Sequence, residues 1–325
     1  MKFGLIGVSL GLLLAAGAWS PATAQWKPTS PVEVVVHTGP GGGNDALGRA
    51  MLTAMEKEKL LPVRFQIANK VGGGSATAMN YLREKKGDPH TISIFSSVYV
   101  SNPLVQPEAN VTMDELTPIA RLVLEPALVV VRADSPFKTM KDFIEAARQK
   151  PNGLKQSGGS VLSRDAVVRQ VLVSHTGAQW PFISFPTGGE RISALLGGHV
   201  DMMIIEPSEA GEMIRAGKLR PIAQVSETRL DAFKDVPTLK EAGYDIPNVP
   251  QARGIVGPPD MPKEAVAYYS DLFKKVSESP AWNKYLEDTL LQNAYLAPAD
   301  LARFNKEYAD TLRSILKDAG VKLVR

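Results

Sequence analysis

The chain has 325 residues, of which 44% are hydrophobic and 22% charged, and its formal net charge at pH 7 is +3. It contains no cysteine, so disulfides do not hold the fold together. The small net charge gives no indication of nucleic-acid binding. The length is sufficient for one large domain or two ordinary domains, each with its own core.

The first 24 residues are typical of a secretory signal peptide. Lys2 precedes an apolar segment, and Ala22-Thr23-Ala24 forms a cleavage site of small residues. The apolar segment is short for a membrane span, which takes about 20 residues. We predict cleavage after Ala24 and export to the periplasm, with an uncleaved N-terminal anchor as the alternative. No later segment is apolar enough to span a bilayer.

Strand-like and helix-like segments alternate along the first part of the mature chain. We expect strands over 32–37, 63–69 and 91–97, with helices over 45–61 and 75–87 between them. This βαβαβ order predicts a parallel sheet covered by helices.

A second series begins near residue 120. The apolar run 120–134 contains Pro126 and is interpreted as two strands or one bent strand, and the helix over 139–149 has Thr139 as its N-cap. The series continues with strands over 154–157, 182–185, 201–205 and 220–226 and helices over 163–176, 190–197 and 207–216. "VPTLKEAG" then predicts a short helix and "RGIVGPP" a strand. "PKEAVAYYSDLFKKVSES" and "PADLARFNKEYADTLRSILKDAG" predict two long amphipathic helices.

The two series predict an α/β protein with two lobes, each a mostly parallel sheet flanked by helices, and a ligand cleft between them. We expect lobe 1 to consist of residues 25–124 plus 229–325, and lobe 2 of residues 125–228.

Four glycine-rich loops each follow an expected strand and precede an expected helix. They are "HTGPGGGNDALGRA" at 37–50, "KVGGGSA" at 70–76, "QSGGSV" at 156–161 and "PTGGER" at 186–191. Glycine lets a ligand approach the main chain, and a helix N-terminus offers unpaired N–H groups to an anion. The sequence therefore predicts an anion pocket made of main-chain groups at the carboxyl ends of the strands. For any single loop, a tight strand-to-helix turn is the alternative.

The sequence contains little that indicates a cofactor, a metal or catalysis. Gly41 to Ala46 fits the dinucleotide pattern G-x-G-x-x-A, but the next strand ends in Ala68-Asn69 without the expected acid. No Walker sequence and no G-x-S-x-G motif follows a strand, and the four histidines lack metal-ligand spacing. We expect no cofactor, no metal and no catalytic residue.

Several side chains are candidates for contacts beyond the glycine loops. Arg164, Arg191 and Arg253 are cations that could bind a second carboxylate, although surface arginines are common. Glu206 would repel an anion unless it is protonated or positions a loop. Asp45 is interpreted as structural, in the first turn of its helix.

The segments "WKPTSPVEVVVHTGPGGGNDALGRAM", "ANKVGGGSATAMNYL", "FPTGGERISALLGGHVDMMI" and "DVPTLKEAGYD" resemble the tripartite tricarboxylate transporter substrate-receptor family, the Bug-type periplasmic solute-binding proteins. The resemblance covers essentially the whole mature chain. It implies a "Venus flytrap" fold, an organic acid as ligand, and a membrane permease as partner. His37-Thr38-Gly39, Ser163 and Pro186-Thr187 depart from the family pattern, so ligand identity does not transfer.

The resemblance implies that main-chain groups of facing loops hold the ligand carboxylate. The expected ligand-binding residues are Pro40, Gly41, Gly42, Asn44, Asp45, Gly73, Gly74, Ser75, Ser97, Gly158, Gly159, Ser160, Thr187, Gly188 and Gly189. Candidates for contacts to a second carboxylate or a ring are His37, Tyr99, Arg164, Arg191 and Glu206. The sequence thus predicts a monomeric periplasmic receptor for a di- or tricarboxylate or an aromatic acid. The alternatives are an exported hydrolase or lyase acting on organic acids, and a sensory adaptor for a two-component system.

Overall fold

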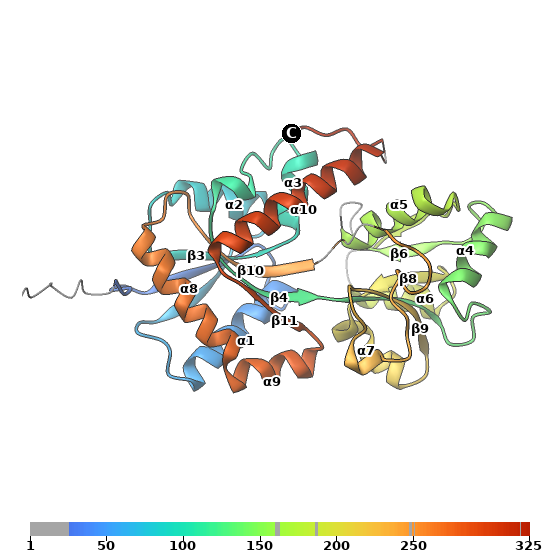
Figure 1. Cartoon of the computed structure of the whole chain (residues 1–325), viewed down its shortest axis with the longest axis horizontal. Helices are drawn as coiled ribbons and strands as arrows, with labels where there is room; N and C mark the ends of the chain where they lie inside the picture. Colours follow the sequence, from blue (N-terminus) through green and yellow to red (C-terminus); the bar gives the residue numbers. More distant parts are fainter. Residues whose placement is uncertain (1–25, 160–162, 186–187, 247–248, 250, 319) are drawn as a thin grey trace, which may run out of the picture.

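Two α/β lobes make up the computed structural model, which describes residues 26–159, 163–185, 188–246, 249, 251–318 and 320–325 (Figure 1). The predicted signal peptide lies outside these ranges, and its cleavage stays a prediction. Within them, no helix is long and apolar enough to cross a membrane.

The first sheet has six strands in the order β11-β4-β10-β3-β1-β2. Strand β1 (Val32–Val36) runs parallel to its two neighbours, β2 (Phe65–Asn69) and β3 (Thr91–Ser96). Antiparallel pairs join β3, β10 (Gln251–Gly257), β4 (Thr117–Glu125) and β11 (Gln292–Leu296).

Helices cover both faces of this sheet, as the β-branched run of β1 indicates. Val34 and Val36 belong to the apolar cluster that contains Met51 of α1, whereas Val35 belongs to the cluster of Met79 in α2. The helical segments of this lobe are α1 (Gly43–Lys57), α2 (Ala76–Glu84), α3 (Val98–Val105), η1 (Met113–Glu115), α8 (Lys263–Glu278), α9 (Pro280–Thr289) and α10 (Pro298–Asp318).

The second sheet has five strands in the order β7-β6-β8-β5-β9. Strand β6 (Gln156–Gly158) is parallel to β7 (Phe182–Ser184) and β8 (Met202–Ile205), whereas β5 (Ala127–Arg132) is antiparallel to β8 and β9 (Leu219–Val225). The helical segments of this part are α4 (Met140–Gln149), α5 (Arg164–Thr176), α6 (Gly188–Leu196), α7 (Pro207–Arg215) and η2 (Asp231–Phe233).

The two-lobed α/β fold is confirmed, but both sheets are mixed where we expected mostly parallel ones. The antiparallel pairs follow from the crossings between lobes. Strand β4 leaves the first sheet and β10 returns to it, so these neighbours run in opposite directions. Strands β5 and β9 enter and leave the second sheet in the same way.

Pro126 separates β4 from β5, which confirms that the run 120–134 forms two strands. Proline has no N–H to donate to a ladder, so it suits the point where one sheet ends and the next begins. A further link between the lobes is α10, which packs on α3 and β4 and also contacts α5. The predicted division of the chain at residues 124/125 and 228/229 stays a prediction.

Five elements were not expected from the sequence, namely α3, α9, β11 and the two short 3-10 helices η1 and η2. Helix α3 contains valines and Pro103, which have low helix propensity, and it is stabilised by burial of Tyr99 and Leu104. The predicted helix in "VPTLKEAG" is wrong. This segment forms turns, because Pro237 O and Leu239 N–H pair with the main chain of Gln224 in β9.

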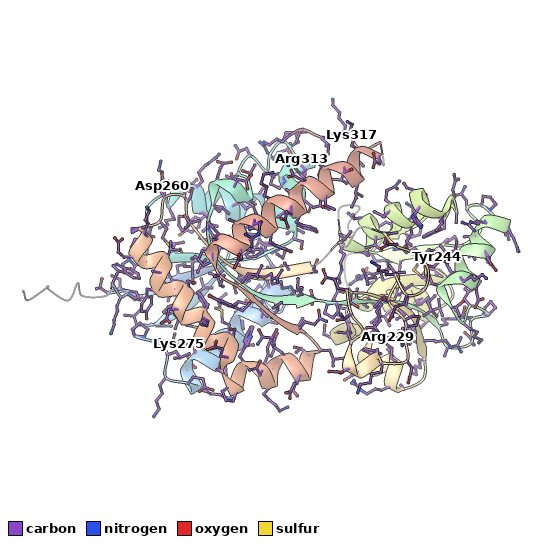
Figure 2. All side chains as sticks on the ribbon, viewed as in Figure 1. Arg229, Tyr244, Asp260, Lys275, Arg313 and Lys317 are labelled. Atoms are coloured by element: carbon purple, nitrogen blue, oxygen red, sulfur yellow. The ribbon has the colours of Figure 1, made fainter. Side chains whose placement is uncertain are left out.

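Charged side chains point outward from both lobes (Figure 2). Lys275 of α8 pairs with Asp271 at 2.7 Å, and Arg313 of α10 pairs with Asp310 at 2.8 Å. Both pairs join residues one helical turn apart, so opposite charges alternate along the surface. This pairing agrees with the small net charge of the chain.

Candidate functional site

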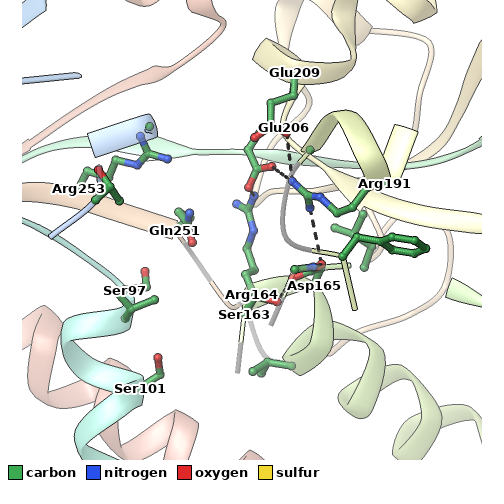
Figure 3. Close-up of a pocket in the computed structure, with 18 of the residues that line it drawn as sticks. Ser97, Ser101, Ser163, Arg164, Asp165, Arg191, Glu206, Glu209, Gln251 and Arg253 are labelled. Atoms are coloured by element: carbon green, nitrogen blue, oxygen red, sulfur yellow. Dashed lines mark hydrogen bonds and ion pairs between the residues drawn. The ribbon is translucent and has the colours of Figure 1, made fainter. Parts of the chain in front are cut away.

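A cavity of about 410 Å³ lies between the two lobes (Figure 3). The first lobe lines it with Thr38, Gly43, Ser97, Val98, Ser101, Gln251 and Arg253, and α10 adds Tyr308 and Leu312. The second lobe lines it with Gly159, Ser163, Arg164, Asp165, Val167, Phe185, Gly188, Arg191, Ile204, Glu206 and Glu209. The walls are rich in charged and hydroxyl groups, so the cavity suits a small polar solute.

Two arginines and a glutamate meet on the wall of the second lobe. Arg164 begins α5, Arg191 lies in the first turn of α6, and Glu206 is the N-cap of α7. They converge because the parallel strands before these helices end at the same edge of the sheet. Arg164 Nη2 lies 2.8 Å from Glu206 Oε1, and Arg191 Nη2 lies 3.8 Å from Glu206 Oε2.

Arg191 also reaches two further carboxylates. Its Nη2 lies 3.1 Å from Glu209 Oε2, and its Nη1 lies 3.7 Å from Asp165 Oδ2. Its side chain is only 12% exposed, so the guanidinium is held from three sides. This wall therefore presents cations whose charge is already balanced by the protein.

The third guanidinium comes from the first lobe. Arg253 of β10 forms an ion pair with Glu125, the last residue of β4. The ion pair joins Arg253 Nη2 to Glu125 Oε2, and Gln251 Nε2 donates to this Oε2 at 3.2 Å. Arg164 Nη1 donates to the main-chain oxygen of Glu125. Glu125 thus connects residues of both lobes beside the cavity.

The acids of the cavity differ in their pKa shifts. Burial tends to raise the pKa of Glu206, but the nearby charges of Arg164 and Arg191 hold that pKa below its usual value. Burial raises the pKa of Asp165. Burial and the neighbouring charge of Glu206 raise the pKa of Glu209. Glu206 is therefore the acid most firmly ionised in this wall.

Two of the predicted glycine loops bind a carboxylate of the protein itself. The N–H of Gly41 donates to Asp45 Oδ2 at 2.9 Å, and the N–H of Gly159 donates to Asp165 Oδ2 at 2.8 Å. Asp45 also accepts from Arg49 Nε at 2.8 Å, in agreement with its predicted structural role. In these two loops the main-chain N–H groups bond an internal carboxylate, and their predicted contact with a ligand stays a prediction.

The loop at 72–74 has a structural role. Gly74 has φ +72° and packs against the Asn102 side chain so closely that a Cβ would overlap it. Ser75 is buried, and its hydroxyl contacts the main-chain oxygen of Val98 at 3.4 Å. This loop lies outside the cavity lining.

His37 is buried beneath the first glycine loop. Its Nδ1 lies 3.2 Å from Asn44 Nδ2, and its ring packs edge-on against Tyr99 at 5.3 Å. Burial, followed by the positive charge of Arg253, lowers the pKa of His37 to about 4. The imidazole is therefore neutral at pH 7 and acts as a hydrogen-bonding core residue.

The structure brings part of the predicted site together. The predicted residues that line the cavity are Ser97, Gly159, Gly188, Arg164, Arg191, Arg253 and Glu206. Those placed outside its lining are Pro40, Gly41, Gly42, Asn44, Asp45, Gly73, Gly74, Ser75, Gly158, Gly189, His37 and Tyr99. Ser160 and Thr187 lie outside the described residues, so their contribution stays a prediction.

Several lining residues were not predicted from the sequence, among them Ser101, Asp165, Glu209, Gln251 and Tyr308. Asp165 follows Arg164 directly after a glycine loop, and this adjacency was a usable signal. Tyr308 carried none, because it lies on a long amphipathic helix whose apolar spacing indicates core packing. Ser101 carried none, because the sequence did not predict the helix α3 that contains it. Among the described residues, no group of three acids, histidines or cysteines is arranged to hold a metal ion.

Comparison with known proteins assigns the chain to a family. The family model described as "Tripartite tricarboxylate transporter family receptor" matches residues 49–321. The chain belongs to this family. It is therefore a solute-binding receptor and not an enzyme, which confirms the resemblance seen in the sequence and excludes the hydrolase or lyase alternative.

Solved structures share the fold. A TctC solute-binding protein from Polaromonas is 27% identical, with a TM-score of 0.75 over 89% of this chain and 99% of that one. Rpa4515 of R. palustris, solved with adipate, is 22% identical with a TM-score of 0.80 over 90% and 98% of the chains. MatC of Rhodopseudomonas palustris, solved with bound malate, is 22% identical with a TM-score of 0.73 over 89% and 100%.

Proposed function

We propose that the mature chain is a monomeric periplasmic receptor that closes its two lobes on a di- or tricarboxylate and delivers it to the membrane permease of a tripartite tricarboxylate-type transporter. The observation that carries this proposal is the interlobe cavity, into which three elements direct Arg164, Arg191 and Arg253. Guanidinium groups bind carboxylates in a forked geometry that fixes the orientation of the ligand.

The comparisons support a small organic acid as the ligand. The two relatives from R. palustris were solved with adipate and malate, which are both dicarboxylates. A cavity of about 410 Å³ accommodates molecules of this size. Phe185 in the lining also offers a ring surface against which an aromatic acid can pack.

A calorimetric panel tests the ligand class. Malate, succinate, adipate, citrate and benzoate are titrated into the purified mature protein, and we expect at least one of them to bind. The variant Arg191→Gln removes a cavity cation and should weaken that binding at least tenfold, because charge-assisted hydrogen bonds contribute about 1.5–3 kcal/mol. Arg215→Gln, at the exposed end of α7, is the control. Absence of binding for all five acids would overturn the proposal.

Delivery to a permease and ligand sensing differ in their partner. Uptake of the bound acid by cells that carry the receptor, and its loss on deletion of the permease, would support transport. Uptake that persists without the permease would favour the sensory adaptor.

A further inference from the structure

The carboxylate of Glu209 lies at the first residue of α6, on the wall of the cavity. Gly188 begins α6, and a Cβ added to Gly188 would overlap Glu209 Oε2. The same carboxylate oxygen accepts from Arg191 Nη2 at 3.1 Å (Figure 3). A helix N-terminus and a guanidinium both stabilise an anion, so the protein has placed its own anion at this position.

The charge balance of the wall makes this position important for an acidic ligand. Two of the lining arginines, Arg164 and Arg191, are paired with Asp165, Glu206 and Glu209. The third, Arg253, is paired with Glu125. A ligand carboxylate added to this wall would lie among three acids, where water screens their repulsion poorly. If one internal carboxylate leaves as the ligand carboxylate arrives, the charge of the wall does not change.

The exposed fraction of each side chain indicates which internal carboxylate can move away from Arg191. The side chain of Glu209 is 42% exposed, whereas those of Asp165 and Glu206 are 8% and 15% exposed. Without Glu209, Arg191 would keep two ion pairs, through Nη2 with Glu206 at 3.8 Å and through Nη1 with Asp165 at 3.7 Å.

Three buried atoms of lining residues have no hydrogen-bond partner among the described residues, namely Thr38 Oγ1, Glu206 Oε2 and Arg253 Nε. The last two belong to charged groups. Buried polar atoms are usually paired, so an unpaired acceptor and donor beside one cavity favour a site that rearranges around a polar guest.

We propose that Glu209 occupies the subsite that receives a ligand carboxylate, and that the ligand displaces it from Arg191 and from the start of α6. This inference rests on the proposed function. Glu209 is then a specificity residue of the receptor. Its carboxylate competes with anions that bind weakly, and only an acid that makes the same contacts can bind Arg191 in its place.

Calorimetry of two matched variants tests the displacement. Malate, succinate and adipate are titrated into the wild-type protein, Glu209→Gln and Glu212→Gln, the last of which changes an exposed acid on the same helix. We expect Glu209→Gln to bind at least one dicarboxylate roughly two- to tenfold more tightly, because a partly exposed ion pair no longer competes. Glu212→Gln should match the wild type.

A second measurement separates competition from direct contact. Without ligand, Glu209→Gln should unfold at the same or a lower temperature, since Arg191 loses a partner, even though acid binding strengthens. Weaker or unchanged acid binding by Glu209→Gln would overturn the inference, as would a ligand-bound crystal structure with Glu209 still on Arg191. If neither the wild type nor either variant binds malate, succinate, adipate, citrate or benzoate, the proposed function fails and this inference fails with it.

Discussion

Glu125 and Arg253 form a buried ion pair at the point where the chain leaves the first lobe. Their side chains are 6% and 11% exposed, and the Glu125 main-chain oxygen accepts from Arg164 of the second lobe. One residue therefore orients a cavity arginine from each lobe. Pro126 follows immediately, so the position of Glu125 is also fixed by the end of β4.

Replacement of Glu125 by Gln should destabilise the protein strongly. The change leaves the Arg253 guanidinium buried without its anion, and breaking a buried pair in this way costs about 3–5 kcal/mol. Urea unfolding measures the loss. The control is Asp134→Asn, which breaks the exposed pair with Arg132 and should cost no more than about 1 kcal/mol. Similar losses in both variants would contradict the prediction.

Replacement of Asp45 by Asn should give a loss of stability that depends on pH. The hydrogen bond from Arg49, together with those from Asn69 and the Gly41 N–H, holds the pKa of Asp45 well below its usual range, against the effect of burial. A depressed folded-state pKa contributes stability above the unfolded pKa of about 3.9, and this contribution is lost as the pH falls further.

We therefore expect Asp45→Asn to lose about 1–3 kcal/mol at pH 7, with a gap to the wild type that narrows below pH ~4. Urea unfolding at pH 7, 5 and 3 measures the gap. Glu56→Gln, an exposed change on the same helix, is the control. A gap that stays constant down to pH 3 would show that the charge of Asp45 is not responsible.

Replacement of Gly74 by Ala should destabilise the protein more than replacement of Gly87. Both glycines have positive φ, +72° and +78°, so each alanine incurs about 1 kcal/mol of backbone strain. A Cβ at Gly74 also overlaps Asn102, whereas a Cβ at Gly87 meets nothing within 4 Å. Thermal unfolding should show the larger shift for Gly74→Ala. Equal shifts would mean that the contact with Asn102 is easily relieved.

The two buried tryptophans should differ in their tolerance of phenylalanine. Trp180 Nε1 donates to Gln156 Oε1 at 2.9 Å, whereas Trp282 Nε1 has no hydrogen-bond partner among the described residues. Both replacements remove a similar volume, but only Trp180→Phe leaves a buried acceptor unpaired. We expect it to cost about 1–2 kcal/mol more than Trp282→Phe in urea unfolding. A larger loss for Trp282→Phe would contradict this.

The sequence predicted the alternation of strands and helices well because that alternation is a local pattern. The β-branched run of β1 and the N-cap Thr139, whose Oγ1 accepts from the Asp142 N–H at 3.2 Å, both behave as expected. Helix α3 was missed because burial of Tyr99 and Leu104 compensates for residues of low helix propensity.

The three cavity arginines were candidates from residue type alone, but their partners were not predictable. Arg164 contacts Glu125 and Glu206, which lie 39 and 42 positions away in the chain. Such pairs depend on which strand ends meet, and that follows from the order of strands in the sheet. Nothing in the sequence near Glu209 indicated that its carboxylate would lie against Gly188.

The sequence by itself determined the fold class, the family and the glycine loops, because these depend on residue type and short-range spacing. The tertiary structure alone decided which carboxylate lies at three of these loops. Asp45 and Asp165 bind the main-chain N–H groups of their own loops, and Glu209 lies on Gly188. A group of N–H donors binds whichever carboxylate the fold places within hydrogen-bond distance. That distance depends on how elements far apart in the sequence pack together.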